Sequence, residues 1–354
     1  MHAHQATLSD SEDRRLGALT LPLTMGGGAV ALTGFIAAIL ASVIADHGLR
    51  QLMFAWLVNF LFLLSISLGA LCFLMWQHVS GAGWVVTVRR LCEVLAANAW
   101  LMGVLGLPIV AAVLFGQGLL HPWTDPHYVE HHAVVAGKQA YLNAPFFAVR
   151  YVIYFAVWIA LARMLYHGSV RQDETGDPAL TVRMSKVSAP GLVLFAFTVT
   201  FATVDWVMSL DPVWFSTVIG VYYFSSAIVG FLGLLILVTV LLQRSGRVTD
   251  SINVEHYQDL GKWLFAFVFF WAYIAFSQYM LIWYGNIPEE TQWYLRHGAS
   301  TAPQDVNVWS AVLLVLLFGH FVIPFLGLLS RHVKRRVAGL TFWAGWMLVM
   351  HWLA

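Results

Sequence analysis

Long apolar runs constrain the fold of this chain more than any other feature of its sequence. A helix needs about 20 mostly apolar residues to cross the hydrocarbon layer of a membrane. Nine stretches meet or nearly meet that length, separated by polar loops such as DHGLR and RQDETGDP. The predicted spans are 20–45, 54–77, 94–119, 146–166, 189–209, 214–242, 262–285, 307–329 and 337–354. We therefore expect an all-α, polytopic transmembrane helix bundle over residues 20–354, preceded by a cytoplasmic tail, 1–19.

The composition agrees with a membrane location and excludes several other classes. Charged residues make up 10% of the chain, whereas soluble proteins have about 25%. The net charge of +1 gives no reason to expect nucleic acid as a partner. The two cysteines, Cys72 and Cys92, form no CxxC pair, which argues against an iron–sulfur cluster, attached haem or cysteine zinc site in this chain.

The distribution of basic residues predicts the orientation. With nine spans, 15 of the 19 Lys and Arg residues fall on the side of the N-terminus, and basic loops stay in the cytoplasm. We therefore expect a cytoplasmic N-terminus, without a signal peptide. The last run ends at MHWLA, about 18 residues after a basic loop. We expect a truncated chain, or a partner helix that completes the bundle.

Two aspartates near the outer end of the span 189–209 have different predicted roles. Asp205 lies about one turn inside the apolar run, where a carboxylate is costly unless it is paired. It is either a proton-handling group or a satisfied structural acceptor, and Arg150 at the outer start of another span could pair with it. Asp211 and Pro212 predict a helix start, with Asp as the N-cap and Pro as the first helical residue.

Two more ionisable residues fall inside predicted spans. His320 lies near the middle of the span 307–329, and Pro324 should free the carbonyl of His320 and bend the helix. His320 is either a proton relay or cofactor ligand, or a packed histidine. Glu93 lies near the inner end of the third span. It is either a further candidate for the proton path or a structural group that Arg89, four residues earlier, neutralises.

The segment around the seventh span has polar residues at its inner end and along one face. Asp259 and Lys262 are three residues apart and can form an ion pair. Tyr273 and Ser277 are four residues apart and share a helix face, which could hold water or contact a neighbouring helix. The candidates for a proton path in this segment are His256, Asp259, Lys262, Tyr273, Ser277 and Gln278.

Metal and haem sites are not expected. The outer loop HPWTDPHYVEHH contains His121 and three further histidines, a mixture that zinc can use, but no HExxH motif is present. Paired haem ligands would need histidines on facing helices at matching depth. His320 and His351 are predicted at different depths.

Two long stretches resemble a known family. The sequences TVDWVMSLDPVWFSTVIGVYYFSSAIVG and HYQDLGKWLFAFVFFWAYIAFSQYMLIWYGNIPEETQWY resemble the ActF subunit of bacterial alternative complex III, a quinol:cytochrome c oxidoreductase. ActF belongs to the NrfD/polysulfide-reductase-like membrane family. The resemblance is most specific from about residue 205 to residue 294. It implies ten helices, arranged as two four-helix bundles and a further pair, in the bacterial cytoplasmic (inner) membrane.

The resemblance also implies a role within a complex. The chain would bind no cofactor itself, while quinol reacts in the complex and partner subunits carry haem c and iron–sulfur clusters. The implied partners are a paralogous NrfD-like subunit (ActC), an iron–sulfur subunit, multihaem cytochrome c subunits and small membrane subunits. The chain would support quinol oxidation and conduct protons along a polar path that includes Asp205, Asp259, Lys262, Tyr273, Ser277, Gln278 and His320.

Two alternatives stay open. The chain could be the quinone-binding anchor of another NrfD-type iron–sulfur or molybdenum enzyme, with Asp205, Arg150 and His320 on the quinone side. It could also be a stand-alone secondary transporter, although the Pro-bent span 307–329 has no clear counterpart in the other half of the sequence.

Overall fold

The computed structural model describes residues 17–45, 48–299 and 306–354, and every regular element in these ranges is a helix. In this part of the chain, eight helical segments are long and apolar enough to cross a membrane. They are Gly17–Ile44, Gly48–Ser80, Gly83–Phe115, Ala144–Thr175, Ala179–Leu210, Ile219–Arg244, Val254–Gly285 and Val308–Leu329. A further apolar helix, Val337–Leu353, has 17 residues. The chain is therefore a multi-pass helical membrane protein.

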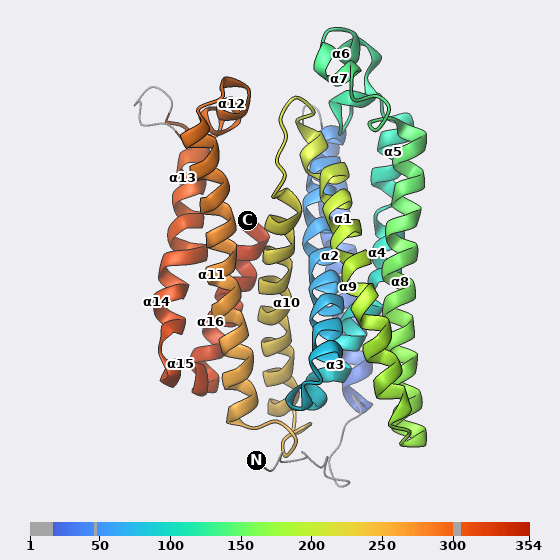
Figure 1. Cartoon of the computed structure of the whole chain (residues 1–354), viewed down its shortest axis with the longest axis vertical. Helices are drawn as coiled ribbons and strands as arrows, with labels where there is room; N and C mark the ends of the chain where they lie inside the picture. Colours follow the sequence, from blue (N-terminus) through green and yellow to red (C-terminus); the bar gives the residue numbers. More distant parts are fainter. Residues whose placement is uncertain (1–16, 46–47, 300–305) are drawn as a thin grey trace.

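The elements follow the order of the predicted spans (Figure 1). The long helices are α1 (Thr20–Ile44), α2 (Gly48–Ser80), α8 (Ala144–Thr175), α9 (Ala179–Trp206), α10 (Ile219–Arg244), α11 (Val254–Gly285) and α16 (Val337–Leu353). Shorter helices form the third segment, namely α3 (Val86–Ala97), α4 (Ala99–Leu105) and α5 (Leu107–Phe115), and the eighth, namely α13 (Val308–Val315), η6 (Leu316–Val322) and α14 (Ile323–Leu329). Loops at the two ends carry α6 (Pro126–Glu130), α7 (Ala133–Ala136), α12 (Pro288–Arg296) and α15 (Arg331–Arg335).

The long segments pack in two groups. In the first, α2 contacts α3, α4, α8 and α9, and α8 also packs along α9. In the second, α11 contacts α10, α14 and α16, and α16 also packs along α10. Figure 1 shows α10 between the two groups, and its contacts with α2 and α9 join them. Because α10 and α2 are mostly buried while the outer helices expose apolar side chains, the core lies along the α2–α10 contact.

α1 lies at the edge of the first group. It has no buried residue, and its main packing partner among the described helices is α2. Most of its exposed side chains are apolar, as in a lipid-facing helix, and the Thr24 and Thr33 hydroxyls donate to carbonyls of the same helix. The predicted tail before it, residues 1–19, lies mostly outside the described residues.

Several helices extend beyond their predicted ends. α8 continues to Thr175, nine residues past the predicted limit, and ends where Gly176 takes a left-handed conformation with φ 66°. α11 begins at Val254, because the Asn253 side chain caps the first backbone N–H groups and His256 completes a capping box. A helix can thus continue through polar residues beyond its apolar run, so the length of the apolar run alone does not predict where the helix ends.

Asp211 and Pro212 do not start a helix, so that prediction is wrong. α10 begins at Ile219, and residues 211–218 form a non-helical connection. The Asp211 carboxylate instead accepts a hydrogen bond from Arg296 at 2.8 Å. This ion pair attaches the end of α12 to the connection that precedes α10.

Candidate functional site

His320 is completely buried among the helices of the second group. It lies in η6, a π-helical segment between α13 and α14, with an exposed fraction of 0%. Its ring packs on the indole of Trp271 from α11, with ring centroids 3.9 Å apart. Neither ring nitrogen has a hydrogen-bond partner among the described residues. Since buried polar groups are normally hydrogen-bonded, His320 is a candidate for binding water or a proton.

Pro324 and Trp346 account for the π-helical turn. Proline lacks an N–H, so a carbonyl in the preceding turn loses its usual donor. In a π-helix, that carbonyl belongs to the fifth residue before the proline, which is Gly319. The Trp346 indole donates to this carbonyl at 2.7 Å. The Gly319 carbonyl is thus satisfied from outside its own helix, and the prediction that Pro324 frees the carbonyl of His320 stays a prediction.

His351 on α16 lies at the same level as His320. The His351 Nε2 atom is hydrogen-bonded to the Ser65 hydroxyl of α2 at 2.7 Å, which links the two helix groups. Gly319 and Met350, the neighbours of the two histidines, are in contact, because a Cβ on Gly319 would lie 2.5 Å from the Met350 sulfur. The prediction of different depths for these histidines is therefore wrong.

A glycine on α10 provides the space for the His351 ring. A Cβ on Gly230 would lie 2.2 Å from the His351 Cδ2 atom, well inside van der Waals contact. One turn earlier on α10, Ser226 is buried, with its hydroxyl unpartnered among the described residues. α10 therefore supplies both the space and a further polar group.

We call Ser65, Ser226, Trp271, His320 and His351 the central cluster. Five polar atoms in it lack a hydrogen-bond partner within the described part of the chain: both ring nitrogens of His320, Nδ1 of His351, Nε1 of Trp271 and the hydroxyl of Ser226. Buried polar groups of this kind commonly bind ordered water. An imidazole can accept a proton at one nitrogen and release one from the other. The central cluster is thus chemically suited to relay protons.

Asp205 is paired with Arg150. Two guanidinium nitrogens, Nε and Nη2, donate to the two carboxylate oxygens at 2.8 Å each, and the Tyr154 hydroxyl donates to Oδ2 at 2.7 Å. Asp205 is 1% exposed and Arg150 6%. The arrangement joins α8 to α9 with a fully bonded carboxylate. Of the two roles left open by the sequence, this geometry satisfies the structural one.

Aromatic residues surround the Arg150 side chain. Its guanidinium carbon lies 3.9 Å from the centroid of the Tyr141 ring and 4.3 Å from that of Phe146, distances that favour cation–π attraction. A third guanidinium nitrogen donates to the Tyr141 carbonyl at 2.9 Å. Arg150 is therefore held on several sides, as a buried arginine requires.

His121 lies beside this ion pair. It is 1% exposed and lies next to the backbone of Asp205 and Trp206, but neither ring nitrogen makes a hydrogen bond of normal geometry. Burial lowers the pKa of His121 from 6.5 to about 4, so the ring is neutral at pH 7. In the sequence, His121 is one of four histidines of a loop in which a metal site is not expected. No signal in the loop distinguishes this buried histidine from its exposed neighbours.

Glu93 belongs to a charge network between α3 and the end of α8. Arg90 donates to its Oε2 atom at 2.6 Å, and Arg89 lies 3.4 Å from Oε1. Both arginines also pair with Asp173 at the end of α8. The predicted Arg89 contact is present, and the network joins α3 to α8.

Charged residues in the first turns of α11 form ion pairs at the surface. Lys262 donates to Asp259 at 2.8 Å, and both side chains are substantially exposed. His256 accepts from the Asn253 backbone N–H in the capping box, which is a structural role. Arg335 of α15 binds Glu255. These contacts lie at the helix end, away from the central cluster.

The predicted polar stripe on α11 is divided in the structure. Tyr273 is 58% exposed and faces away from the bundle. Ser277 donates to the Ile274 carbonyl of its own helix at 2.9 Å. Gln278 accepts from the Ser216 hydroxyl at 2.8 Å, which attaches α11 to the connection before α10. The structure therefore brings none of the three into the central cluster.

The three residues predicted for the quinone side do not lie together in the structure. Arg150 and Asp205 are paired in the first helix group, whereas His320 lies in the second. Within the described residues, no group of three or more His, Cys, Asp or Glu side chains is arranged to hold a metal ion.

The fold and these sites define a multi-pass helical membrane protein with buried ionisable residues in both helix groups. No protein-family model and no curated protein matches the chain.

Proposed function

We propose that this chain is an integral membrane subunit of a quinol:cytochrome c oxidoreductase of the alternative complex III type. In this role it supports quinol oxidation and conducts protons through its helix bundle. The class of complex comes from the resemblance of residues 205–294 to the ActF subunit. The proton-conducting role is supported by the central cluster.

The observation that carries the proton-conducting role is the state of His320. Its ring is completely buried, and both nitrogens lack partners among the described residues. A histidine kept only for packing would normally satisfy at least one ring nitrogen. Because Gly319 and Met350, the sequence neighbours of His320 and His351, are in contact, a short chain of water could connect the two rings.

In this proposal the polypeptide crosses the membrane nine times. The short helix α16 forms the ninth span, and the N-terminus lies in the cytoplasm of a bacterium. The ninth span is proposed because α16 is an apolar helix of 17 residues. The orientation is proposed because, with nine spans, 15 of the 19 Lys and Arg residues fall on the side of the N-terminus. The two helix groups correspond to the two four-helix bundles that the resemblance implies, with α1 outside them.

The proposed division of labour leaves electron transfer to other subunits. An iron–sulfur subunit and multihaem cytochrome c subunits would carry electrons, and a paralogous NrfD-like subunit would lie beside this chain. This chain would break no substrate bond. Its contribution would be to move the protons that quinol oxidation releases or that the complex transports.

Purification of the tagged, full-length chain from its native membrane tests this proposal. We expect c-type haem, iron–sulfur clusters and quinol:cytochrome c activity to co-purify with the chain in constant proportion. Co-purification with a molybdenum enzyme would instead support the anchor alternative. A chain that purifies alone and transports a solute would contradict the proposal.

A further inference from the structure

Two lysines from different helices lie close together where α15 meets the first turns of α11. Figure 1 shows α15 and the start of α11 at the same end of the bundle, and the two helices are in contact. The Lys334 side chain packs on the backbone of α11, because a Cβ on Gly261 would lie 3.0 Å from the Lys334 Cγ atom. The residue after Gly261 is Lys262. Burial and the nearby charge of Lys262 both lower the pKa of Lys334.

This end of the protein, which we call the basic cluster, has more positive than negative charge. Residues 254–262 and 331–336 contain five Lys and Arg side chains and two carboxylates. Each carboxylate already forms an ion pair with one of these cations. The cations that have no carboxylate partner among the described residues are Arg331, Lys334 and Arg336. The basic cluster can therefore accept an anion.

Lys334 is the most buried cation of the basic cluster, with an exposed fraction of 8%. Its ammonium group donates to the carbonyls of Leu328 at 2.8 Å and Leu329 at 3.2 Å, at the end of α14. It also lies 4.8 Å from the centroid of the Phe265 ring. An ammonium group has three N–H donors, so one donor remains. None of these neutral partners cancels its charge, and an anion close by would do so.

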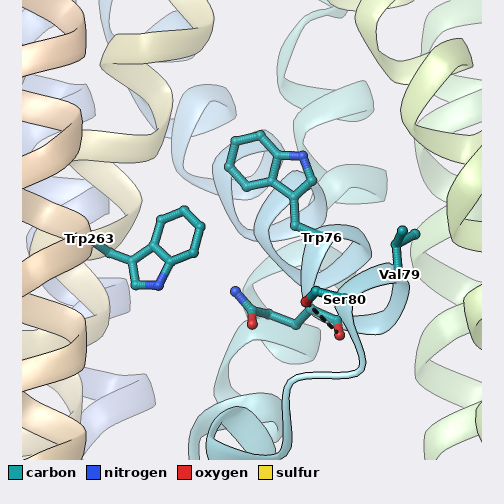
Figure 2. A pocket seen from close by; sticks show the side chains of 5 residues that line it. Trp76, Val79, Ser80 and Trp263 are labelled. Atoms are coloured by element: carbon teal, nitrogen blue, oxygen red, sulfur yellow. Dashed lines mark hydrogen bonds between the residues drawn. The ribbon is translucent and has the colours of Figure 1, made fainter.

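An aromatic surface continues from the basic cluster along α11 and α14. Figure 2 shows the Trp263 indole projecting toward the helix that carries Trp76, on one side of α11. Since successive helical residues are rotated by about 100°, Phe265 and Phe269 lie on the other side of α11. Phe325 of α14 packs on both, with ring centroids 5.1 Å from Phe265 and 6.1 Å from Phe269. Phe269 is 52% exposed, so this surface is open to lipid.

The combination of charge and aromatic surface distinguishes between possible ligands. Basic groups at the ends of transmembrane helices bind the phosphate of anionic lipids. A free phosphate ion would occupy the basic cluster and leave the aromatic surface uncovered. A zwitterionic lipid would bring a further cation to a site that already has excess positive charge. An anionic phospholipid satisfies both parts, because its phosphate and its acyl chains are joined in one molecule.

We propose that this surface is a binding site for an anionic phospholipid. Its phosphate would lie among Lys262, Arg331 and Lys334, and an acyl chain would lie along Phe265 and Phe269. The bound lipid would hold α15 against α11 by bridging their cations. The site goes beyond the proposed function and does not depend on it, since binding of a lipid requires neither turnover nor haem subunits.

Photo-crosslinking with two matched lipids tests the proposal. The full-length protein is purified in its native assembly and placed in phosphatidylcholine nanodiscs. These contain a trace of phosphatidylglycerol or of phosphatidylcholine, each with the same diazirine-labelled acyl chain. We expect the phosphatidylglycerol probe to label the peptides with residues 265–269 or 325 at least about fivefold more than the phosphatidylcholine probe. Equal labelling by both probes would overturn the proposal.

Two further results address other occupants of the surface. Unlabelled phosphatidylglycerol should displace the probe, whereas inorganic phosphate at the same concentration should not, because it lacks acyl chains. Equal displacement by inorganic phosphate would overturn the lipid assignment in favour of a simple anion site. Labelling that is absent from both peptides would overturn it in favour of a partner protein that covers the surface.

Three variants identify the cations that select the lipid. Lys262→Gln and Arg331→Gln each remove one charge at an exposed position, so the fold should be kept. Each should lower labelling by the phosphatidylglycerol probe about fivefold and leave labelling by the phosphatidylcholine probe unchanged. Lys186→Gln is the matched control, because Lys186 is an exposed lysine of α9 in the other helix group. Labelling of Lys262→Gln and Arg331→Gln equal to that of Lys186→Gln would overturn the proposal.

Discussion

Arg150 and Asp205 form a buried, bidentate ion pair that joins the start of α8 to the end of α9. Removing one partner would leave the other charge buried without compensation. Arg150→Leu should therefore lower the free energy of unfolding by about 3–5 kcal/mol. The measurement is unfolding of the purified protein in mixed micelles, followed by circular dichroism.

The double variant provides the control for this prediction. Replacing both residues, as Arg150→Leu with Asp205→Leu, removes the charge imbalance and should cost less than Arg150→Leu alone. Tyr154→Phe should lose only one hydrogen bond to a charged group, about 1.5–3 kcal/mol. If the stability losses of the Arg150→Leu and Asp205→Leu single variants sum to that of the double variant, the ion-pair contact is contradicted.

Gly230 should tolerate no side chain, because α10 passes so close to the His351 ring. Gly230→Ala places a methyl group where the imidazole lies, and we expect a loss of about 1–3 kcal/mol in the free energy of unfolding. The second variant His351→Ala should relieve part of this loss by vacating the space. Thermal unfolding of the single and double variants measures the effect.

A matched glycine on α16 is the control. Gly345 has no atom within 4 Å of a built Cβ. Gly345→Ala should therefore leave stability unchanged or raise it by up to about 1 kcal/mol, as expected for a helix interior. If Gly230→Ala and Gly345→Ala change the free energy of unfolding by the same amount, the close contact between α10 and the His351 ring is contradicted.

His121 should make the protein sensitive to acid. Burial lowers its pKa from 6.5 to about 4, so between these values the unfolded chain binds a proton that the folded protein does not. The stability that His121 contributes is fully present above pH 6.5 and is lost as the pH falls toward 4. The expected loss is about 3 kcal/mol.

His121→Asn removes this titration and keeps a polar side chain. The free energy of unfolding of the variant should fall less steeply than that of the wild type between pH 6.5 and 4. His127, an exposed histidine of the same loop, provides the control through His127→Asn, which should leave the slope unchanged. Equal slopes for all three proteins would show that His121 is accessible to protons when folded.

The fold could be predicted in outline because apolar run length fixes where helices can cross a membrane. Helix ends were less predictable, since polar caps decide them. The Asp–Pro pair at Asp125 and Pro126 does start a helix, with the Asp125 carboxylate capping His127. The same pair at residues 211 and 212 does not, because Asp211 binds Arg296 instead.

The sites depend on packing between distant segments, which a single sequence does not contain. Ser65 and His351 are 286 positions apart, and their hydrogen bond requires α2, α10 and α16 to meet. The pairing of Arg150 with Asp205 could be anticipated, because each buried charge needs a partner. The burial of His121 could not be anticipated, because it depends on how the loop between α5 and α8 packs against the end of α9.

His320 gives the most direct test of the central claim. In His320→Phe, the aromatic contact with Trp271 is kept and proton exchange is lost. The purified complex is reconstituted in liposomes, and quinol:cytochrome c turnover and proton release are recorded together. Tyr273→Phe is the control, because Tyr273 faces away from the bundle.

We predict that His320→Phe lowers proton transfer at least about tenfold, while Tyr273→Phe matches the wild type. Assembly is verified by unchanged haem content of the purified complex. Wild-type turnover together with wild-type proton release in a fully assembled His320→Phe complex would contradict the account.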